Sequence, residues 1–304
     1  MEYELIIVRY GEIALKGKTT RRHFENRLVS NIKNALNREQ ITHSIKKEWG
    51  RIYVYTNQIN KSMDVLQRIF GIVSMSPTVQ TQSNMSSMSN LAVSISKDAL
   101  TEEKTFAIRA TRGGNHKYTS QDVAVELGND LVKATKASVD LTKPDFKLFI
   151  EIRDESAYIF TEKIRGTGGL PLGTQGKLLA LIDDSDSILA AWYLMRRGCT
   201  IIFVNINKSI TDILNSFITN WYAESDVIMI DPKQSSLYEN LNKTASERNC
   251  DAVVTGHIIY KDFQKKLSEI MLMKKHMNLP ILHPLLSMEN EDINKKCKEI
   301  GIVT

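Results

Sequence analysis

The residues best suited to chemistry are the acidic side chains of a short turn, Asp183-Asp184-Ser185-Asp186-Ser187. The turn follows an apolar run, Leu178 to Ile182, and precedes an apolar helical pattern that extends to Arg197. Strand–turn–helix units of this kind often bind phosphate in α/β domains, because the first amides of a helix are free and point outward. Here three carboxylates stand where a phosphate-binding turn would carry glycines.

The residues alone leave three interpretations of this turn open. It is a phosphate-binding loop that has lost its glycines, or the site of a metal-dependent phosphatase. The second interpretation rests on Asp184-Ser185-Asp186-Ser187, which loosely resembles the DxDx(T/S) motif of haloacid-dehalogenase-like phosphatases. The third is structural, because aspartate and serine are good helix N-caps that the positive end of a helix dipole favours.

A second polar segment, Thr255-Gly256-His257, follows the apolar run that begins at Ala252. It is expected at the same sheet edge as the acidic turn, where His257 could donate to a phosphate or simply be a loop residue. The sequence shows no Ser/His/Asp order, no metal-ligand spacing and no CxxC pair, so it predicts neither a catalytic residue nor a metal site.

Positive charge is concentrated in the first half of the chain. Residues 1–165 carry 25 basic and 19 acidic side chains, whereas residues 166–304 carry 15 and 16. Basic side chains neutralise RNA phosphates, and a tyrosine among them could stack on a base; an ordinary solvated surface is the alternative. The candidate RNA-binding residues are Lys16, Lys18, Arg21, Arg22, Arg109, Arg112, His116, Lys117, Tyr118, Lys163 and Arg165.

The first half predicts two small α+β domains. The order β-α-β-β-α-β predicts a ferredoxin-like domain over residues 1–75, with strands at 5–10, 41–47, 51–56 and 71–75 and helices at 21–37 and 62–69. Residues 76–90 are polar and poor in charge, which predicts a loop or linker. A second domain, 76–165, is expected to hold helices at 91–100 and 121–137, a strand at 105–110 and a hairpin at 146–163. Thr119 or Ser120 is the expected cap of its second helix.

The second half, residues 166–304, alternates apolar runs with helical patterns and predicts an open, mostly parallel α/β sheet. Strands are expected at 178–182, 200–205, 227–230, 252–255 and 281–282, and helices at 187–197, 212–223, 237–248, 262–275 and 290–300. No apolar run approaches the roughly 18 residues of a membrane span, and the N-terminus lacks a signal-peptide pattern, so a cytoplasmic location without membrane contact is expected.

Several motifs resemble the tRNA 4-thiouridine synthases, or tRNA sulfurtransferases. They are Gly11-Glu-Ile-Ala-Leu-Lys-Gly-Lys18, Phe70-Gly71-Ile72, the segment 106–120 and Arg165-Gly-Thr-Gly-Gly-Leu-Pro-Leu-Gly-Thr-Gln-Gly-Lys177. The resemblance implies a ferredoxin-like domain, a THUMP domain that binds the tRNA acceptor region, and a PP-loop pyrophosphatase domain. In that family ATP adenylates a uridine, and a persulfide-bearing cysteine delivers sulfur.

The sequence departs from the family pattern at the chemical site. The family's Ser-Gly-Gly-x-Asp-Ser falls on residues 182–187, so only Asp186 and Ser187 remain, and its Thr-Gly-Glu-Ser keeps only Thr255 and Gly256. These four are the candidate nucleotide-binding residues. The sequence ends at Thr304, before the segment that carries the family's catalytic cysteine, so a degenerate and truncated PP-loop domain is expected. Binding of ATP and Mg²⁺ is expected to be impaired.

The leading hypothesis is therefore a tRNA-binding protein that takes part in tRNA thiolation while its own adenylation site is impaired. A separate sulfur carrier or catalytic subunit would then complete the reaction, and a homodimer is compatible with the sequence. The alternative is an active ATP-dependent tRNA 4-thiouridine synthase that uses a separate sulfur carrier. A phosphatase that acts without tRNA is the third hypothesis.

Overall fold

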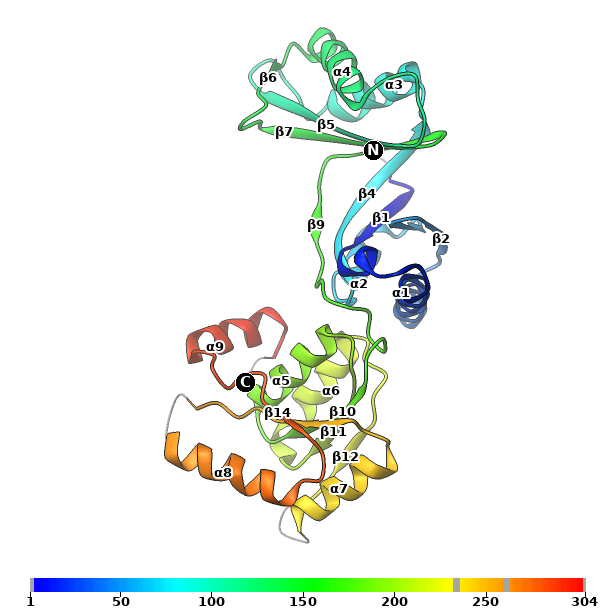
Figure 1. Ribbon diagram of the computed structural model, residues 1–304. Coiled ribbons are helices and arrows are strands. Elements are labelled where there is room, and N and C mark those ends of the chain that lie inside the picture. Colours follow the sequence, from blue (N-terminus) through cyan, green and yellow to red (C-terminus); the bar gives the residue numbers. More distant parts are fainter. Residues whose placement is uncertain (1–2, 232–235, 260–262, 303–304) are drawn as a thin grey trace. The chain divides into compact units, whose positions relative to one another are not determined.

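The computed structural model describes residues 3–231, 236–259 and 263–302, which divide into two units (Figure 1). The first unit holds the described residues up to Tyr10 together with Leu36–Gln67 and Val73–Arg165. The second holds Gly11–Ala35, Arg68–Ile72 and the described residues from Gly166 onward. Most of helix α1 (Lys18–Arg38) therefore belongs to the second unit.

The first unit is built on one continuous sheet with the strand order β2-β3-β1-β4-β8-β7-β5-β6, and β9 pairs with β4. Most neighbours are antiparallel, but β5 is parallel to both β6 and β7. Helices α2 (Ile59–Leu66), α3 (Met85–Ser96) and α4 (Ser120–Thr135) complete the unit. The strands are β1 (Leu5–Tyr10), β2 (Ser44–Glu48), β3 (Arg51–Tyr55), β4 (Ile72–Gln82), β5 (Thr105–Gly113), β6 (Ser138–Val139), β7 (Phe146–Arg153), β8 (Ser156–Phe160) and β9 (Ile164–Arg165).

The predicted linker over residues 76–90 is wrong, because β4 continues to Gln82 and α3 begins at Met85. Ser76 and Thr78 are buried but paired: Arg9 donates to Ser76 Oγ (3.0 Å), and Thr78 Oγ1 donates to the Ser76 carbonyl (2.9 Å). Polar side chains that are satisfied in this way can occupy a buried strand, which composition alone does not reveal.

Smaller corrections concern element boundaries in the first half of the sequence. A 3₁₀ helix, η1 (Glu12–Leu15), lies between the strand predicted at 5–10 and the helix predicted at 21–37, and this helix, α1, begins at Lys18, earlier than expected. Helix α2 begins three residues before the predicted start at Ser62. The expected cap of α4 is confirmed at Thr119, whose side chain accepts from the amide of Asp122.

The second unit contains the predicted parallel sheet, with the strand order β12-β11-β10-β13-β14. Its strands are β10 (Lys177–Ile182), β11 (Thr200–Asn205), β12 (Val227–Met229), β13 (Ala252–Val254) and β14 (Ile281–Leu282). Its helices after β10 are α5 (Ser185–Arg196), η2 (Lys208–Ile210), α6 (Thr211–Asn220), α7 (Leu237–Glu247), α8 (Phe263–His276) and α9 (Asn290–Glu299). These bounds agree closely with the expected ranges; Asp262, the expected start of α8, lies outside the described residues.

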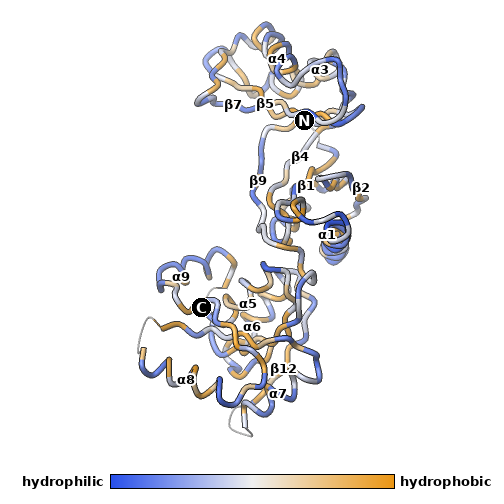
Figure 2. The backbone as a smooth tube through the Cα atoms, viewed as in Figure 1, coloured by the Kyte–Doolittle hydropathy of each residue, from blue (hydrophilic) through white to orange (hydrophobic). Residues whose placement is uncertain are grey.

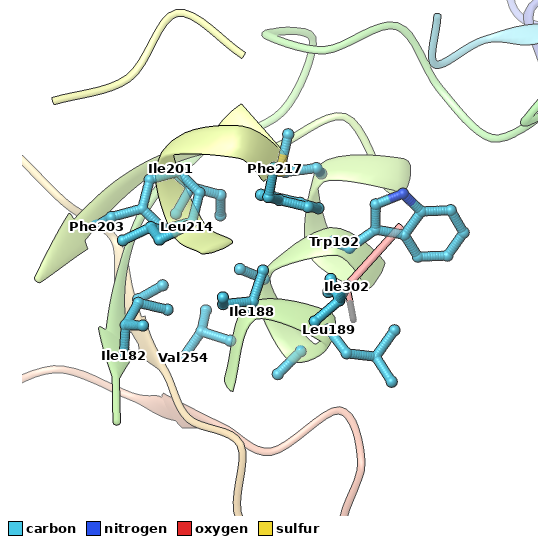
Figure 3. Close-up of a cluster of buried hydrophobic side chains, with 14 of the residues drawn as sticks. Ile182, Ile188, Leu189, Trp192, Ile201, Phe203, Leu214, Phe217, Val254 and Ile302 are labelled. Carbon is cyan, nitrogen blue, oxygen red and sulfur yellow. The ribbon is translucent and has the colours of Figure 1, made fainter. Parts of the chain in front are cut away.

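The side chains of β10 alternate between two apolar clusters, one on each face of this sheet. Leu178, Ala180 and Ile182 pack with α5, α6 and α9, and Figure 3 shows part of this cluster around Trp192. Leu179 and Leu181 pack on the opposite face with residues of α7 and α8. Figure 1 shows these two helices on that side of the sheet. Strands that are buried on both faces read as continuous apolar runs, which is why the sequence located them well.

The hydrophilic sides of the helices lie outside these clusters. Figure 2 shows α1 and α9 as mostly hydrophilic, although α9 places Ile293 and Cys297 in the cluster that contains Trp192. Within the described ranges, the model contains no helix with the length and apolar character that a membrane crossing requires.

Candidate functional site

The parallel register of the second sheet places the acidic turn beside Thr255-Gly256. Leu178 pairs with Ala252 and Ala180 with Val254, so β10 and β13 end at the same edge. Gly256 lies against the first turn of α5: a Cβ on Gly256 would be 2.5 Å from the Ser187 nitrogen and 2.7 Å from its Cα. Only glycine fits there, and the structure therefore brings all four predicted nucleotide-binding residues together.

The turn satisfies its own amides. Asp184 is the N-cap of α5, and its carboxylate accepts from the Ser187 amide at 2.9 Å. The Ser187 hydroxyl donates to the Asp184 carbonyl (2.6 Å) and lies within 3.2 and 3.3 Å of the amides of Asp183 and Asp184. The helix-cap interpretation of the aspartates is thus confirmed, and the amides of residues 183, 184 and 187 already have acceptors inside the turn.

The cleft over this turn is small and acidic. Its volume is about 120 Å³, whereas ligand pockets commonly measure roughly 300–1,000 Å³. Within the described residues, its three carboxylates face one ammonium, that of Lys266, which pairs with Glu269 at 2.9 Å. The lining residues are Leu181, Asp183, Asp184, Asp186, Thr255, Gly256, His257, Ile258 and Lys266.

The carboxylates of the turn disfavour one another's charge. Burial, and then the negative charge of Asp184, raise the pKa of Asp186 to about 6. The same two causes raise the pKa of Asp183 to about 6, but this side chain keeps much of its contact with water, which screens its charge. A further anion at this position would meet the same repulsion.

Two histidines beside the turn add no positive charge at neutral pH. Thr255 Oγ1 lies 2.8 Å from His257 Nδ1 and 2.7 Å from His283 Nδ1. One hydroxyl can donate to one of these nitrogens and accept from the other, so the two rings hold opposite tautomers. Burial lowers the pKa of both histidines, with the charge of Lys266 acting further on His257 and that of His257 on His283.

The three cysteines of the sequence are not activated thiols. Burial raises the pKa of Cys199, Cys250 and Cys297, and for Cys297 the charges of Asp186 and Asp184 help to raise it to about 11. The thiolate is the reactive form, so these thiols are poor nucleophiles near pH 7. Within the described ranges, no group of three or more His, Cys, Asp or Glu side chains is arranged to hold a metal ion.

The raised pKa of Asp186 predicts a pH-dependent stability. Its ionisation opposes folding as the pH rises from about 4 through about 6, because the folded state binds the proton more tightly. We expect Asp186→Asn to be about 1–2 kcal/mol more stable than the parent at pH 7, allowing for partial solvent screening, with no difference near pH 4. Urea unfolding at both pH values measures this. Asp212→Asn, at an exposed position in the first turn of α6, is the control, and an equal gain for it would contradict the assignment.

Four of the candidate RNA-binding residues of the first unit line two clefts. Arg112 lines a cleft of about 720 Å³, whereas His116, Lys117 and Tyr118 line another of about 560 Å³. The Tyr118 hydroxyl donates to the Ser83 carbonyl, and its ring packs 5.2 Å from that of His116. Tyr118 is therefore anchored within the loop, which reduces its freedom to stack on a base.

The other candidates are more dispersed. Arg109 donates to the Leu141 carbonyl (2.5 Å), and the Lys163 ammonium lies 4.4 Å from the centre of the Phe149 ring. Arg165 is exposed at the end of β9, with its backbone paired to Ser74. The remaining four belong to the second unit, where they lie at or just before the start of α1: Lys16, Lys18, Arg21 and Arg22.

The first unit also contains an ion cluster that was not predicted from the sequence. Glu151 on β7 is only 5% exposed and accepts from the Nε atoms of Arg51 (2.6 Å) and Arg153 (2.9 Å). Its second oxygen accepts from Arg9 NH2 at 3.2 Å. Burial alone would raise the pKa of Glu151, but the charges of Arg51 and Arg9 and the hydrogen bonds from the arginines hold it below its ordinary value. The only sequence signal was a charged residue inside an apolar strand.

Family models match three successive parts of the chain. A ThiI ferredoxin-like domain matches residues 5–76, a THUMP domain matches residues 82–162, and the model described as "Thiamine biosynthesis protein (ThiI)" matches residues 209–304. A probable tRNA sulfurtransferase of Methanobrevibacter smithii is 33% identical, over 99% of this chain and 87% of the relative. The chain belongs to the tRNA sulfurtransferase family.

Other members of the tRNA sulfurtransferase family extend this agreement. A tRNA sulfurtransferase of Pyrobaculum aerophilum is 32% identical, over 98% of this chain and 67% of the relative. A solved 4-thiouridine synthetase–RNA complex with bound ATP has a TM-score of 0.84 at 27% identity, covering 99% of this chain and 86% of that chain. A Pyrococcus horikoshii protein has a TM-score of 0.85 at 29% identity, covering 98% and 99%. The expected family and fold class are thus confirmed.

Proposed function

We propose that this chain is a tRNA-binding protein of the tRNA sulfurtransferase family that takes part in tRNA thiolation while its own adenylation site is impaired. The carrying observation is the hydrogen bond from the Ser187 amide to the Asp184 carboxylate. The Asp184 carboxylate thus accepts the hydrogen bond of an amide in the first turn of α5. A phosphate bound there would need this amide as a free donor. The residues of the turn do not fit a nucleotide triphosphate.

The size of the electrostatic penalty supports this proposal. Two unit charges about 4 Å apart repel by roughly 1–4 kcal/mol between bulk water and a protein surface. Asp183 and Asp184 would each impose such a cost on a phosphate, and Lys266, the one ammonium that the described part of the chain places in the cleft, is already paired with Glu269. The side chains of Asp183 and Asp184 also fill space that glycine would leave to the ligand.

Sulfur transfer is proposed to depend on a separate sulfur carrier or catalytic subunit. The raised pKa values of Cys199, Cys250 and Cys297 support this, because none of these thiols is prepared to carry a reactive persulfide. tRNA is the proposed substrate, the cytoplasm is the proposed location, and a homodimer stays a prediction from the sequence.

Release of AMP tests the impairment. The purified chain is incubated with ATP, Mg²⁺ and unmodified tRNA, and AMP is followed over time, with an active family member as the positive control. We expect no AMP above the level without tRNA. AMP release that requires both tRNA and this chain would overturn the proposal and favour the active enzyme.

The second candidate function is an active ATP-dependent 4-thiouridine synthase that receives sulfur from a carrier. It is favoured by the ATP bound in the solved 4-thiouridine synthetase complex and by the positions of Asp186, Ser187, Thr255 and Gly256 at one sheet edge. It predicts that this chain restores 4-thiouridine in a deletion strain and that Asp186→Ala does not. Equal rescue by both chains, or by neither, would count against it.

The basic residues of the first unit are proposed to contact tRNA phosphates. We expect Arg112→Ala and Lys117→Ala each to lower tRNA affinity several-fold and to reduce the slope of log K against log salt by about one phosphate contact. Filter binding at several salt concentrations measures both quantities. Lys274→Ala, near the end of α8, is the matched control for loss of one positive charge. An unchanged affinity in the double variant would count against RNA binding by this surface.

A further inference from the structure

The indole of Trp49 stands exposed beside the 720 Å³ cleft of the first unit. Its exposed fraction is 71%, whereas the other two tryptophans, Trp192 and Trp221, are 2% and 8% exposed. Trp49 lies at the tip of the β2–β3 hairpin, and the opposite wall of the cleft comes from the ends of β5 and β7. An exposed tryptophan next to a cleft of this size is a candidate contact for a planar ligand.

The backbone of the hairpin tip is fixed although the indole is not covered. The Trp49 carbonyl accepts from Arg153 NH1 (3.1 Å), and the Gly50 carbonyl accepts from Arg51 NH1 (2.7 Å). The Gly50 amide donates to the Tyr10 hydroxyl (3.0 Å), and Gly50 has a φ of +76°, which glycine adopts without strain. The indole is thus presented from a defined position, and this preorganisation lowers the entropic cost of binding.

Glu151 holds the arginines that fix this tip. It accepts from the Nε atoms of both Arg51 and Arg153, which leaves their remaining N–H groups to reach the tip carbonyls and the cleft. The side chains of Arg51, Arg112 and Arg153 line the cleft together with Glu48, Glu151 and Asp154. The charges of these six lining side chains balance, and two further cations behind them, Arg9, which pairs with Glu151, and Lys46, which pairs with Glu48, bring the net charge of this set to +2.

We propose that this cleft binds an unpaired nucleotide of the RNA, with its base stacked on Trp49 and its phosphate against the arginines. This inference rests on the proposed function that the chain binds RNA. A base inside a duplex is already covered on both faces, so only an unpaired base can offer a free face to an indole. Gly113 leaves open space on this wall, because a Cβ there would meet only the Ile152 carbonyl at 3.9 Å, whereas the space beside Gly114 is filled by the Asp154 carboxylate.

Two hairpin RNAs with the same stem test the proposal, one blunt and one with a four-nucleotide single-stranded 3′ tail. We expect Trp49→Ala to weaken binding of the tailed RNA roughly 5- to 100-fold and to leave the blunt RNA unchanged within about twofold. Trp49→Phe keeps an aromatic face and is expected to retain most of the affinity. Because Trp49 is exposed, unfolding curves of the variants should match the parent, which separates binding from folding.

Fluorescence gives a second readout. Trp192 and Trp221 are buried, so a short single-stranded oligoribonucleotide should quench mainly the emission of Trp49, and the quenching should be absent in Trp49→Phe. Loss of affinity in Arg112→Ala and Lys117→Ala without an effect of Trp49→Ala would overturn the stacking proposal and leave RNA binding intact. If none of these variants lowers the affinity, both the stacking proposal and the proposed RNA binding by the first unit would be overturned. If Trp49→Ala weakened the binding of tailed and blunt RNA equally, the stacking proposal would also be overturned, because Trp49 would then act without an unpaired base.

Discussion

Replacing Asp183 and Asp184 with glycine is expected to raise the affinity of this chain for ATP at least about 100-fold. The double variant removes two carboxylates that would each repel a phosphate by roughly 1–4 kcal/mol, and it frees the Ser187 amide that Asp184 now occupies. Glycine is also an acceptable helix N-cap, so losing the Asp184 cap should cost only a few tenths of a kcal/mol. Isothermal titration of both proteins with ATP and Mg²⁺ measures the change.

The Asp183→Asn/Asp184→Asn variant separates charge from space. Asparagine removes both negative charges but keeps the side-chain atoms and the ability to cap α5. If repulsion dominates, this variant should gain nearly as much affinity as the glycine variant; if backbone clearance dominates, it should gain little. An affinity of the glycine variant no better than that of the parent would show that the turn is not what limits ATP binding.

Glu151→Ala is expected to lower the free energy of unfolding by about 3–5 kcal/mol. Glu151 is buried and accepts from Arg9, Arg51 and Arg153, so its removal leaves three largely buried guanidinium groups without their counter-charge. Because Arg9 and Arg51 belong to strands distant in the sequence from β7, which carries Glu151 and Arg153, the loss should affect the cooperative unfolding of the first unit. Urea unfolding followed by circular dichroism measures the change.

Two comparisons sharpen this prediction. Glu151→Gln keeps the shape and part of the hydrogen bonding, so its loss should be smaller, whereas Glu162→Ala removes one exposed charge and should change stability little. The pKa of Glu151 is lower in the folded protein than in the unfolded chain. The stabilisation by ionised Glu151 is therefore complete above the unfolded pKa, near 4.3, and disappears as the pH falls through the folded pKa. A Glu151→Ala loss equal at pH 7 and pH 3 would contradict the ionic explanation.

The second sheet was predictable because its strands are buried on both faces. Runs such as Leu178–Ile182 and Thr200–Asn205 are almost wholly apolar and are separated by helical patterns of ordinary length. The caps at Thr119 and Asp184 were predictable for a local reason, since the capping side chain and the amide it accepts from are three residues apart.

The missed features depend on contacts between distant residues. Segment 76–82 contains Ser, Thr and Gln in a strand whose residues 75–78 are buried, and Arg9, 67 residues from Ser76, donates to the buried Ser76 hydroxyl. Glu151 lies 100 residues from Arg51 and 142 from Arg9, so no local pattern indicates their cluster. Trp49 lies between the strands predicted at 41–47 and 51–56, but its exposure beside a cleft depends on how these strands meet β5 and β7.

The most direct test of the central claim is a calorimetric titration of the unaltered chain with ATP and Mg²⁺, followed by a crystal soaked with the same ligand. We expect no measurable binding below about 1 mM and no triphosphate at residues 183–187, because the Ser187 amide already donates to the Asp184 carboxylate. Micromolar affinity, together with β- and γ-phosphates held against these residues, would contradict it.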